Sequence, residues 1–143
     1  MKKNFKLILI IIWMVVIFMF SQQNAVSSLN TSEGLLYDIL SIFKLSHENI
    51  INLIDILGGP IRKLAHFSEY AILGLLVLYY LNDYQSLSIK RIIVYEILFC
   101  FLYACSDEIH QYFIPGRAMM FKDVLIDTSG SILSAIGYSL CKK

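Results

Sequence analysis

The stretch Ser106–Asp127, SDEIHQYFIPGRAMMFKDVLID, places acids, a histidine and an arginine between two strongly apolar segments. A second polar stretch, Arg62–Tyr70, RKLAHFSEY, begins another apolar segment. Charged residues that face the interior of a helix bundle at a membrane boundary are costly, and they therefore mark candidate functional sites. We expect the two stretches to meet and to form one polar site in a small membrane protein.

The composition places the chain among membrane proteins. Its 143 residues are enough for one domain. Hydrophobic residues make up 57 % and charged residues 16 %, against about 45–50 % and about 25 % in soluble domains. The three cysteines form no CxxC pair, which favours free thiols over a disulfide framework.

Apolar segments predict four membrane helices, at about residues 7–25, 64–81, 92–105 and 123–141. Between the first two, residues 30–60 contain shorter apolar runs at helical spacing, which predict interfacial helices in an outer loop. Gly58-Gly59-Pro60 is expected to end the second of these short helices. The fold class is therefore all-α: a polytopic four-helix transmembrane bundle that forms one domain over residues 1–143.

The first apolar segment has a second interpretation. A basic start and a short apolar run before Ala25-Val26-Ser27 are also typical of a cleaved signal peptide. The bulky Trp13, Phe18 and Phe20 favour a retained span.

The distribution of positive charge predicts the orientation. With four spans, seven basic residues fall on one side, which the positive-inside rule makes cytoplasmic; they are Lys2, Lys3, Lys6, Lys90, Arg91, Lys142 and Lys143. Both termini are then cytoplasmic in a bacterial plasma membrane, and both polar stretches open outward.

In the second predicted helix, Lys63, His66 and Tyr70 follow one another at spacings of three and four, and Glu69 lies three after His66. Residues so spaced share a helix face. His66 and Glu69 are thus expected to point into the bundle near its outer end, where they can act in acid–base chemistry or only in structural hydrogen bonding.

If residues 106–113 are helical, Asp107, His110 and Gln111 share a face while Glu108 points elsewhere. Pro115-Gly116 then predicts a turn. Arg117 follows this turn, and its planar fork suits either a bound carboxylate or phosphate or a salt bridge to a nearby aspartate.

The last predicted helix carries a stripe of two acids followed by small residues. Its members are Asp123, Asp127, Gly130, Ser134, Gly137 and Cys141. Small residues at helical spacing let a neighbouring helix approach closely in lipid. The two acids are expected to face the same interior, with His66, His110 or Arg117 as partner. Glu96, on the third helix, is expected to form an ion pair with Lys90-Arg91 at the inner side.

Other site classes have little support in the sequence. The histidines and acids include enough donors for a divalent ion, but no HExxH occurs and no metal ligand is assigned. No GxSxG elbow frames a serine nucleophile. The absence of GxxxxGK[ST] and GxGxxG argues against a nucleotide enzyme, nothing indicates nucleic-acid binding, and no motif identifies a cofactor.

The two polar stretches and the last predicted helix resemble those of the VanZ-like family of small bacterial membrane proteins. The resemblance rests on RKxAHFxEYxxxG over residues 62–74 and SDExHQxFxPGR over residues 106–117, and it continues through Asp123-Val124, Asp127, Gly130 and Gly137. With Phe20-Ser21-Gln22 it covers nearly the whole chain. It implies an association with low-level resistance to teicoplanin and its lipidated relatives, without a settled reaction. Met119-Met120 stands where a small polar or acidic residue is expected in relatives.

Two functional hypotheses follow, beside the simpler one that the polar set only fixes helix packing. In the first, the protein binds an anionic envelope lipid or a lipidated ligand; the ligand-binding candidates are Lys63, Tyr70, Gln111 and Arg117. In the second, it is an intramembrane hydrolase or transferase that acts on a lipid-linked envelope precursor. The catalytic candidates are His66, Glu69, Asp107, His110, Asp123 and Asp127.

Overall fold

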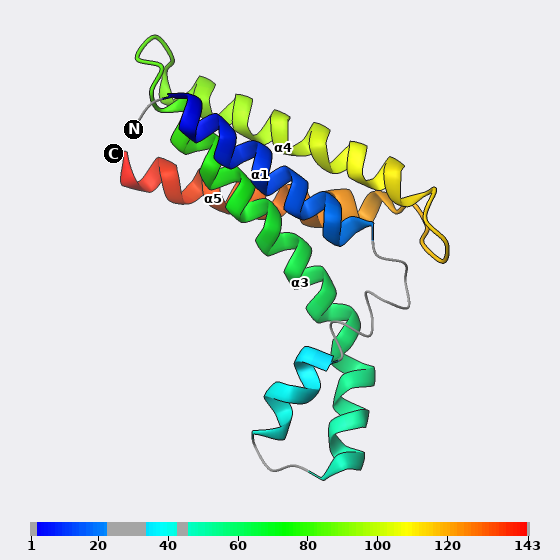
Figure 1. Ribbon diagram of the computed structural model, residues 1–143. Coiled ribbons are helices and arrows are strands. Elements are labelled where there is room, and N and C mark those ends of the chain that lie inside the picture. Colours follow the sequence, from blue (N-terminus) through cyan, green and yellow to red (C-terminus); the bar gives the residue numbers. More distant parts are fainter. Residues whose placement is uncertain (1–2, 23–33, 43–45, 143) are drawn as a thin grey trace.

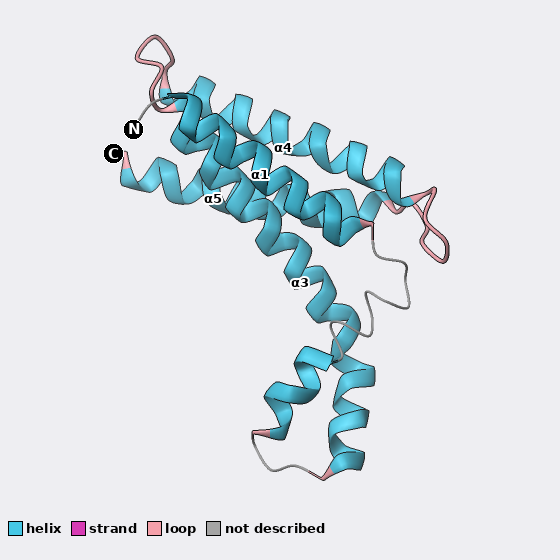
Figure 2. Cartoon of the chain, in the orientation of Figure 1, coloured by secondary structure: helices cyan, strands magenta, loops and turns pink. Residues whose placement is uncertain are grey.

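The computed structural model describes residues 3–22, 34–42 and 46–142, and within these ranges all regular structure is helical, as the apolar periodicity predicts (Figures 1 and 2). The long helices are α1 (Lys3–Ser21), α3 (His47–Leu81), α4 (Ile89–Gln111) and α5 (Phe121–Cys141). A shorter helix covers residues 34–41. The predicted extension of the first span through residues 23–25 lies outside the described residues.

The helices of the bundle run up and down, so that both ends of the chain lie at one end of it (Figure 1). The turn between α3 and α4 lies at that same end, where the Tyr138 hydroxyl donates to Asn82 Oδ1 at 2.8 Å. The loop between α4 and α5 lies at the opposite end. Of the basic residues predicted to be cytoplasmic, the described ones gather at the end where both termini lie; they are Lys3, Lys6, Lys90, Arg91 and Lys142. The polar stretches of α3 and α4 belong to the other end.

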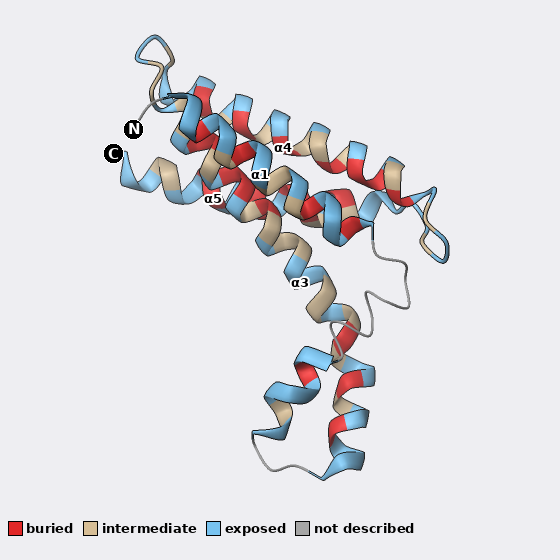
Figure 3. Cartoon of the chain, viewed as in Figure 1, coloured by how far each residue is buried: buried red, intermediate tan, exposed pale blue. Residues whose placement is uncertain are grey.

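Among the residues that the structure describes, three helices, α1, α3 and α5, are long and apolar enough to cross a membrane. The charged residues near its ends and in its interior keep α4 outside this group, although its outward face carries the exposed Val94, Leu98 and Leu102. Exposed large apolar side chains cover the other helices too (Figure 3). An apolar outside around a partly polar inside is the polarity that a lipid environment favours.

The interior of the bundle is part apolar and part polar. Tyr70 and Leu73 of α3 pack with Cys100 of α4 and Ile17 of α1. Glu96 is also fully buried, and its carboxyl lies beside Gly74 of α3, whereas Lys90 and Arg91 are exposed. The expected ion pair with Lys90-Arg91 is therefore wrong. The surroundings of Glu96 are described below.

Helix α3 does not end at Gly58-Gly59-Pro60, and that prediction is wrong. The helix is continuous from His47 and changes direction near Pro60 (Figure 1), as helices commonly do at a proline. Apolar contacts carry it past the glycines: Ile50 and Ile54 pack with Leu36, and Leu57 and Ile61 join them. This packing outweighs the low helix propensity of the three residues.

With 35 residues, α3 is about 52 Å long at about 1.5 Å per residue. The hydrocarbon core of a bilayer is only about 30 Å thick. The part that packs on the helix of residues 34–41 therefore extends away from the bundle (Figure 1).

The small-residue stripe of α5 is a close-contact surface only in part. Gly130 lies directly against the backbone of α3 at Phe67 and Ala71, and Ser134 Oγ donates to the carbonyl of Ala71 at 2.6 Å. Gly137 has open space where a Cβ would be. The predicted packing role of Gly137 is therefore wrong, because Gly137 lies on an exposed face of α5.

Helix α1 is tied to the rest of the bundle by polar contacts as well as by apolar packing. Lys6 Nζ lies 2.7 Å from Asp83 Oδ1 and donates to the carbonyl of Tyr79 at 3.0 Å. The Tyr103 hydroxyl donates to the carbonyl of Met14 at 2.6 Å. These contacts join α1 to α3 and α4; whether the first segment is retained stays a prediction.

Replacing Asp83 with asparagine is expected to lower the free energy of unfolding by about 1–2 kcal/mol, between the values typical of exposed and of buried ion pairs. The reason is that the Lys6 ammonium, only 5 % exposed, loses its counter-charge. Thermal unfolding in detergent measures the change, with Asp55→Asn as control because Asp55 is exposed. Equal shifts in the two variants would contradict this role of Lys6.

Candidate functional site

The two polar stretches meet at one cavity of about 220 Å³ between α3, the α4–α5 loop and α5. Helix α3 contributes Arg62, Lys63 and His66 to its lining, and α5 contributes Asp123, Ile126 and Asp127. The end of α4 and the loop supply Gln111, Gly116, Arg117, Ala118 and Met120. Residues about 50 positions apart in the chain thus surround a single space.

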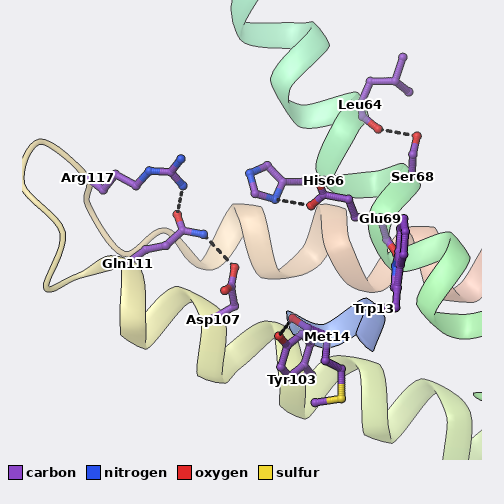
Figure 4. A network of polar contacts seen from close by, with 10 residues as sticks. All are labelled: Trp13, Met14, Leu64, His66, Ser68, Glu69, Tyr103, Asp107, Gln111 and Arg117. Carbon is purple, nitrogen blue, oxygen red and sulfur yellow. Dashed lines mark hydrogen bonds and ion pairs between the residues drawn. The ribbon is translucent and has the colours of Figure 1, made fainter. Parts of the chain in front are cut away.

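A chain of hydrogen bonds holds Arg117 at this cavity (Figure 4). Its Nη1 donates to Gln111 Oε1 at 2.8 Å, and Gln111 Nε2 donates to Asp107 Oδ2 at 2.9 Å. Gln111 and Asp107 are 5 % and 3 % exposed. The predicted turn brings the arginine back toward α4, and Gly116 adopts the left-handed φ of 79° that a glycine allows without strain.

The positive charge of Arg117 is only partly compensated by its surroundings. Burial and then the charge of Arg62 lower the pKa of Arg117, while Asp107, Glu108 and Asp123 oppose this shift. An arginine nevertheless remains protonated in proteins. The expected salt bridge to Asp107, Asp123 or Asp127 does not occur among the described ion pairs, so the guanidinium keeps donors for another acceptor.

His66 and Glu69 lie on one face of α3, as their spacing predicts, and His66 reaches the cavity (Figure 4). His66 Nδ1 lies 3.6 Å from Glu69 Oε2, an ion pair when the imidazole is protonated. The backbone carbonyl of Glu69 accepts a hydrogen bond of 2.9 Å from Trp13 Nε1. Helix α1 therefore supports the back of the site behind this pair.

Asp123 and Asp127 line the cavity from α5, one helical turn apart. Asp127 is only 2 % exposed. The Oδ1 atom of each aspartate is buried without a hydrogen-bond partner within the described part of the chain. Both carboxyl groups are thus available to a ligand in the cavity.

Other predicted site residues do not reach the cavity. His110 stacks on Phe18 of α1 with ring centroids 4.6 Å apart, and Tyr70 is fully buried beside Tyr103. Glu69 contacts the lining residue His66, and Asp107 contacts the lining residue Gln111, but neither acid lines the cavity itself. The predicted residues that line the cavity are Lys63, His66, Gln111, Arg117, Asp123 and Asp127.

Two charged residues near the site, Arg62 and Glu108, are not among the predicted site residues. Arg62 lines the cavity, and its position four residues before His66 is the sequence signal that identifies it. Glu108 was expected to point elsewhere, but it is 3 % exposed, and its Oε2 accepts the Met120 N–H at 2.8 Å. Burial raises the pKa of Glu108, and the bond from Met120 opposes this shift. Glu108 thereby fastens the end of α4 to the start of α5, which no local pattern reveals.

The arrangement combines anion-binding groups with a histidine and two carboxyl groups. Arg62, Lys63 and Arg117 form no ion pair with a carboxylate among the described residues. Residues 3–22, 34–42 and 46–142 contain no group of three or more His, Cys, Asp or Glu placed to hold a metal ion. The three cations can hold an anionic group, and the histidine and the two carboxyl groups lie beside it.

Comparison with known proteins agrees with the motifs that meet at this cavity. No curated protein and no solved structure matches the sequence. A family model described as VanZ/LLP1 matches residues 5–142, which include all four long helices from Phe5 onward and every residue of the cavity lining. The chain belongs to the VanZ/LLP1 family.

Proposed function

We propose that the protein binds the anionic group of an envelope lipid, or of a lipidated ligand such as a lipoglycopeptide, in the cavity between α3 and α5. The observation that carries the proposal is the convergence of three cations, Arg62, Lys63 and Arg117, on one space with no carboxylate ion-paired to them in the described chain. Such a cluster is stabilised by an anion, and the arginine fork suits phosphate or carboxylate.

The setting of the cavity favours a lipid-borne ligand. Exposed apolar side chains surround the polar interior. The apolar outer face of α4 supports a fourth span beside α1, α3 and α5, which are long and apolar enough to cross a membrane. In this arrangement both termini are cytoplasmic and the cavity opens at the outer leaflet of a bacterial plasma membrane. The helix of residues 34–41 and the part of α3 that packs on it lie near the outer interface.

Binding to matched short-chain lipids tests the proposal. Purified protein in detergent is titrated with phosphatidylglycerol and with phosphatidylcholine of the same chain length. We expect tighter binding of the anionic lipid, with an affinity that falls as salt increases. The variant Lys63→Gln/Arg117→Gln should lose this preference. Equal affinity of the wild type for the two lipids would contradict the proposal.

The family resemblance adds a test in cells. If the cavity binds a lipidated glycopeptide or the lipid it competes for, cells expressing the wild-type chain should be less susceptible to teicoplanin than cells expressing Lys63→Gln/Arg117→Gln. Membrane levels of the two proteins must be matched. Equal susceptibility at matched levels would mean that the cavity of this protein does not contribute to teicoplanin resistance.

A second candidate function is acid–base chemistry on a lipid-linked envelope precursor. The observation that favours it is the His66–Glu69 pair at 3.6 Å, whose histidine lines the same cavity as Asp127. His66 is better placed than His110 as general acid or base, because His110 packs on Phe18. His66→Gln should then abolish a lipid product seen by mass spectrometry without weakening the binding of phosphatidylglycerol. If His66→Gln instead lowers the amount of folded protein, the polar set acts in helix packing.

A further inference from the structure

Glu96 is a second buried acidic position, separate from the cavity. Its side chain is 0 % exposed at the interface of α4 with α3 and α5. Asp107, the acid of α4 nearest the cavity, lies eleven residues further along, which is about 16 Å along a helix axis. The contacts of Glu96 therefore belong to a different level of the bundle.

The neighbouring helices leave a space for this carboxyl group. A Cβ built on Gly74 of α3 would lie 2.5 Å from Glu96 Oε1 and 3.2 Å from Ser131 Cα and Ser134 Cβ of α5. A side chain at position 74 would thus occupy the place of the carboxyl. Gly74 is needed here for the space it leaves, so that three helices enclose one acidic group.

No cation or other acid faces the Glu96 carboxyl in the ranges that the structure describes. On α4, Cys100 Sγ donates to Oε1 at 3.7 Å, and Oε2 is buried without a partner. Helix α3 presents Gly74, which carries no titratable group. Helix α5 presents Ser131 and Ser134, whose hydroxyls donate to the carbonyls of Thr128 and Ala71. Lys90 and Arg91 are exposed.

An isolated carboxylate in this place would be costly. The effective penalty for burying an unpaired ion is several kcal/mol, and a buried acid avoids it by keeping its proton. Acidic residues inside membrane bundles are commonly sites of proton binding. A neutral carboxyl, in contrast, fits the small uncharged space between Gly74 and the two serines.

We propose that Glu96 is a membrane-embedded proton-binding site that holds one proton at neutral pH while α3 and α5 close over it. The ligand is a proton, and its release requires that α3 move away from α4 or that water enter the Gly74 space. Proton binding at Glu96 is thereby coupled to the packing of the same two helices that carry the cavity. This coupling is independent of which ligand the cavity binds.

Infrared spectroscopy of the full-length protein in lipid membranes tests this assignment. The wild type should show protonated carboxylic acid C=O absorbance at neutral pH, and Glu96→Gln, whose amide has the shape of the neutral acid, should lose one component of that band. Asp83→Asn is the matched control and should leave that band unchanged, because the Asp83 carboxylate pairs with Lys6. If Glu96→Gln removes carboxylate absorbance and leaves the acid band intact, the proposal is wrong.

A second measurement decides the question if Glu96→Gln fails to accumulate. Glutamate labelled with 13C is incorporated into a Glu69→Gln/Glu108→Gln background, which removes the glutamates near the cavity. The acid band should shift to lower frequency on labelling and persist through the neutral pH range. An acid band of which no component shifts on labelling would overturn the proposal without any change at Glu96.

Discussion

Replacing Gly130 with alanine is expected to destabilise the protein by about 1–3 kcal/mol or more, a typical range for overpacking a close contact. The added Cβ would meet the carbonyl oxygen and carbon of Phe67 and the amide nitrogen of Ala71. These atoms belong to the backbone of α3, so no flexible side chain can move aside and the two helices must separate. The cost exceeds the gain of about 1 kcal/mol that alanine offers over glycine in a helix.

Gly137→Ala is the matched control for this prediction. It makes the same change in the same helix, where nothing lies within 4 Å of the new Cβ, so its stability should be unchanged or slightly higher. Thermal unfolding in detergent compares the two variants. Similar unfolding temperatures for both would mean that α3 and α5 do not approach this closely at Gly130.

Replacing Arg117 with glutamine is expected to weaken the binding of short-chain phosphatidylglycerol by about 10- to 100-fold. Hydrogen bonds to charged groups contribute about 1.5–3 kcal/mol, and about 1.4 kcal/mol corresponds to a factor of ten in affinity. Gln111 and Asp107 already hold the guanidinium at the cavity, so little ordering is needed on binding. Arg117→Lys keeps the charge but loses the planar fork, and its affinity should be intermediate.

Lys122→Gln provides the control for the loss of one positive charge. Lys122 is exposed on α5 near the same loop and does not line the cavity. Its removal should change the affinity only slightly, whereas Arg117→Gln should also reduce the salt dependence of binding. If the two variants lose affinity equally, a general surface charge and not the cavity attracts the lipid.

The sites of the Gly130 and Arg117 predictions lie close together in the bundle. Gly130 lies one turn from Asp127, a lining residue of the cavity. A displacement of α5 at Gly130 therefore changes the cavity as well as the stability of the bundle. Gly130→Ala is for this reason a poor probe of function, and Arg117→Gln, which changes a loop residue, is the better one.

The sequence by itself determined the class of protein and the residues that gather at one end of it. Apolar segments of helical length, separated by polar stretches, are a property of local composition, and they predicted an all-helical chain. Helical spacing also placed His66 with Glu69 and Asp107 with Gln111. Such pairs lie within one turn, so local geometry fixes them.

Only the tertiary structure decided how these stretches face one another. It carried α3 through Gly58-Gly59-Pro60, because the packing of Ile50 and Ile54 on Leu36 is a long-range contact. It directed Glu108 to the start of α5 and His110 to α1, and it separated Gly130, in contact with α3, from Gly137, which is open. The helical repeat decides which residues of one helix share a face, but which face is buried depends on the neighbouring helix. That neighbour is set by packing between distant segments, which no local pattern in the sequence encodes.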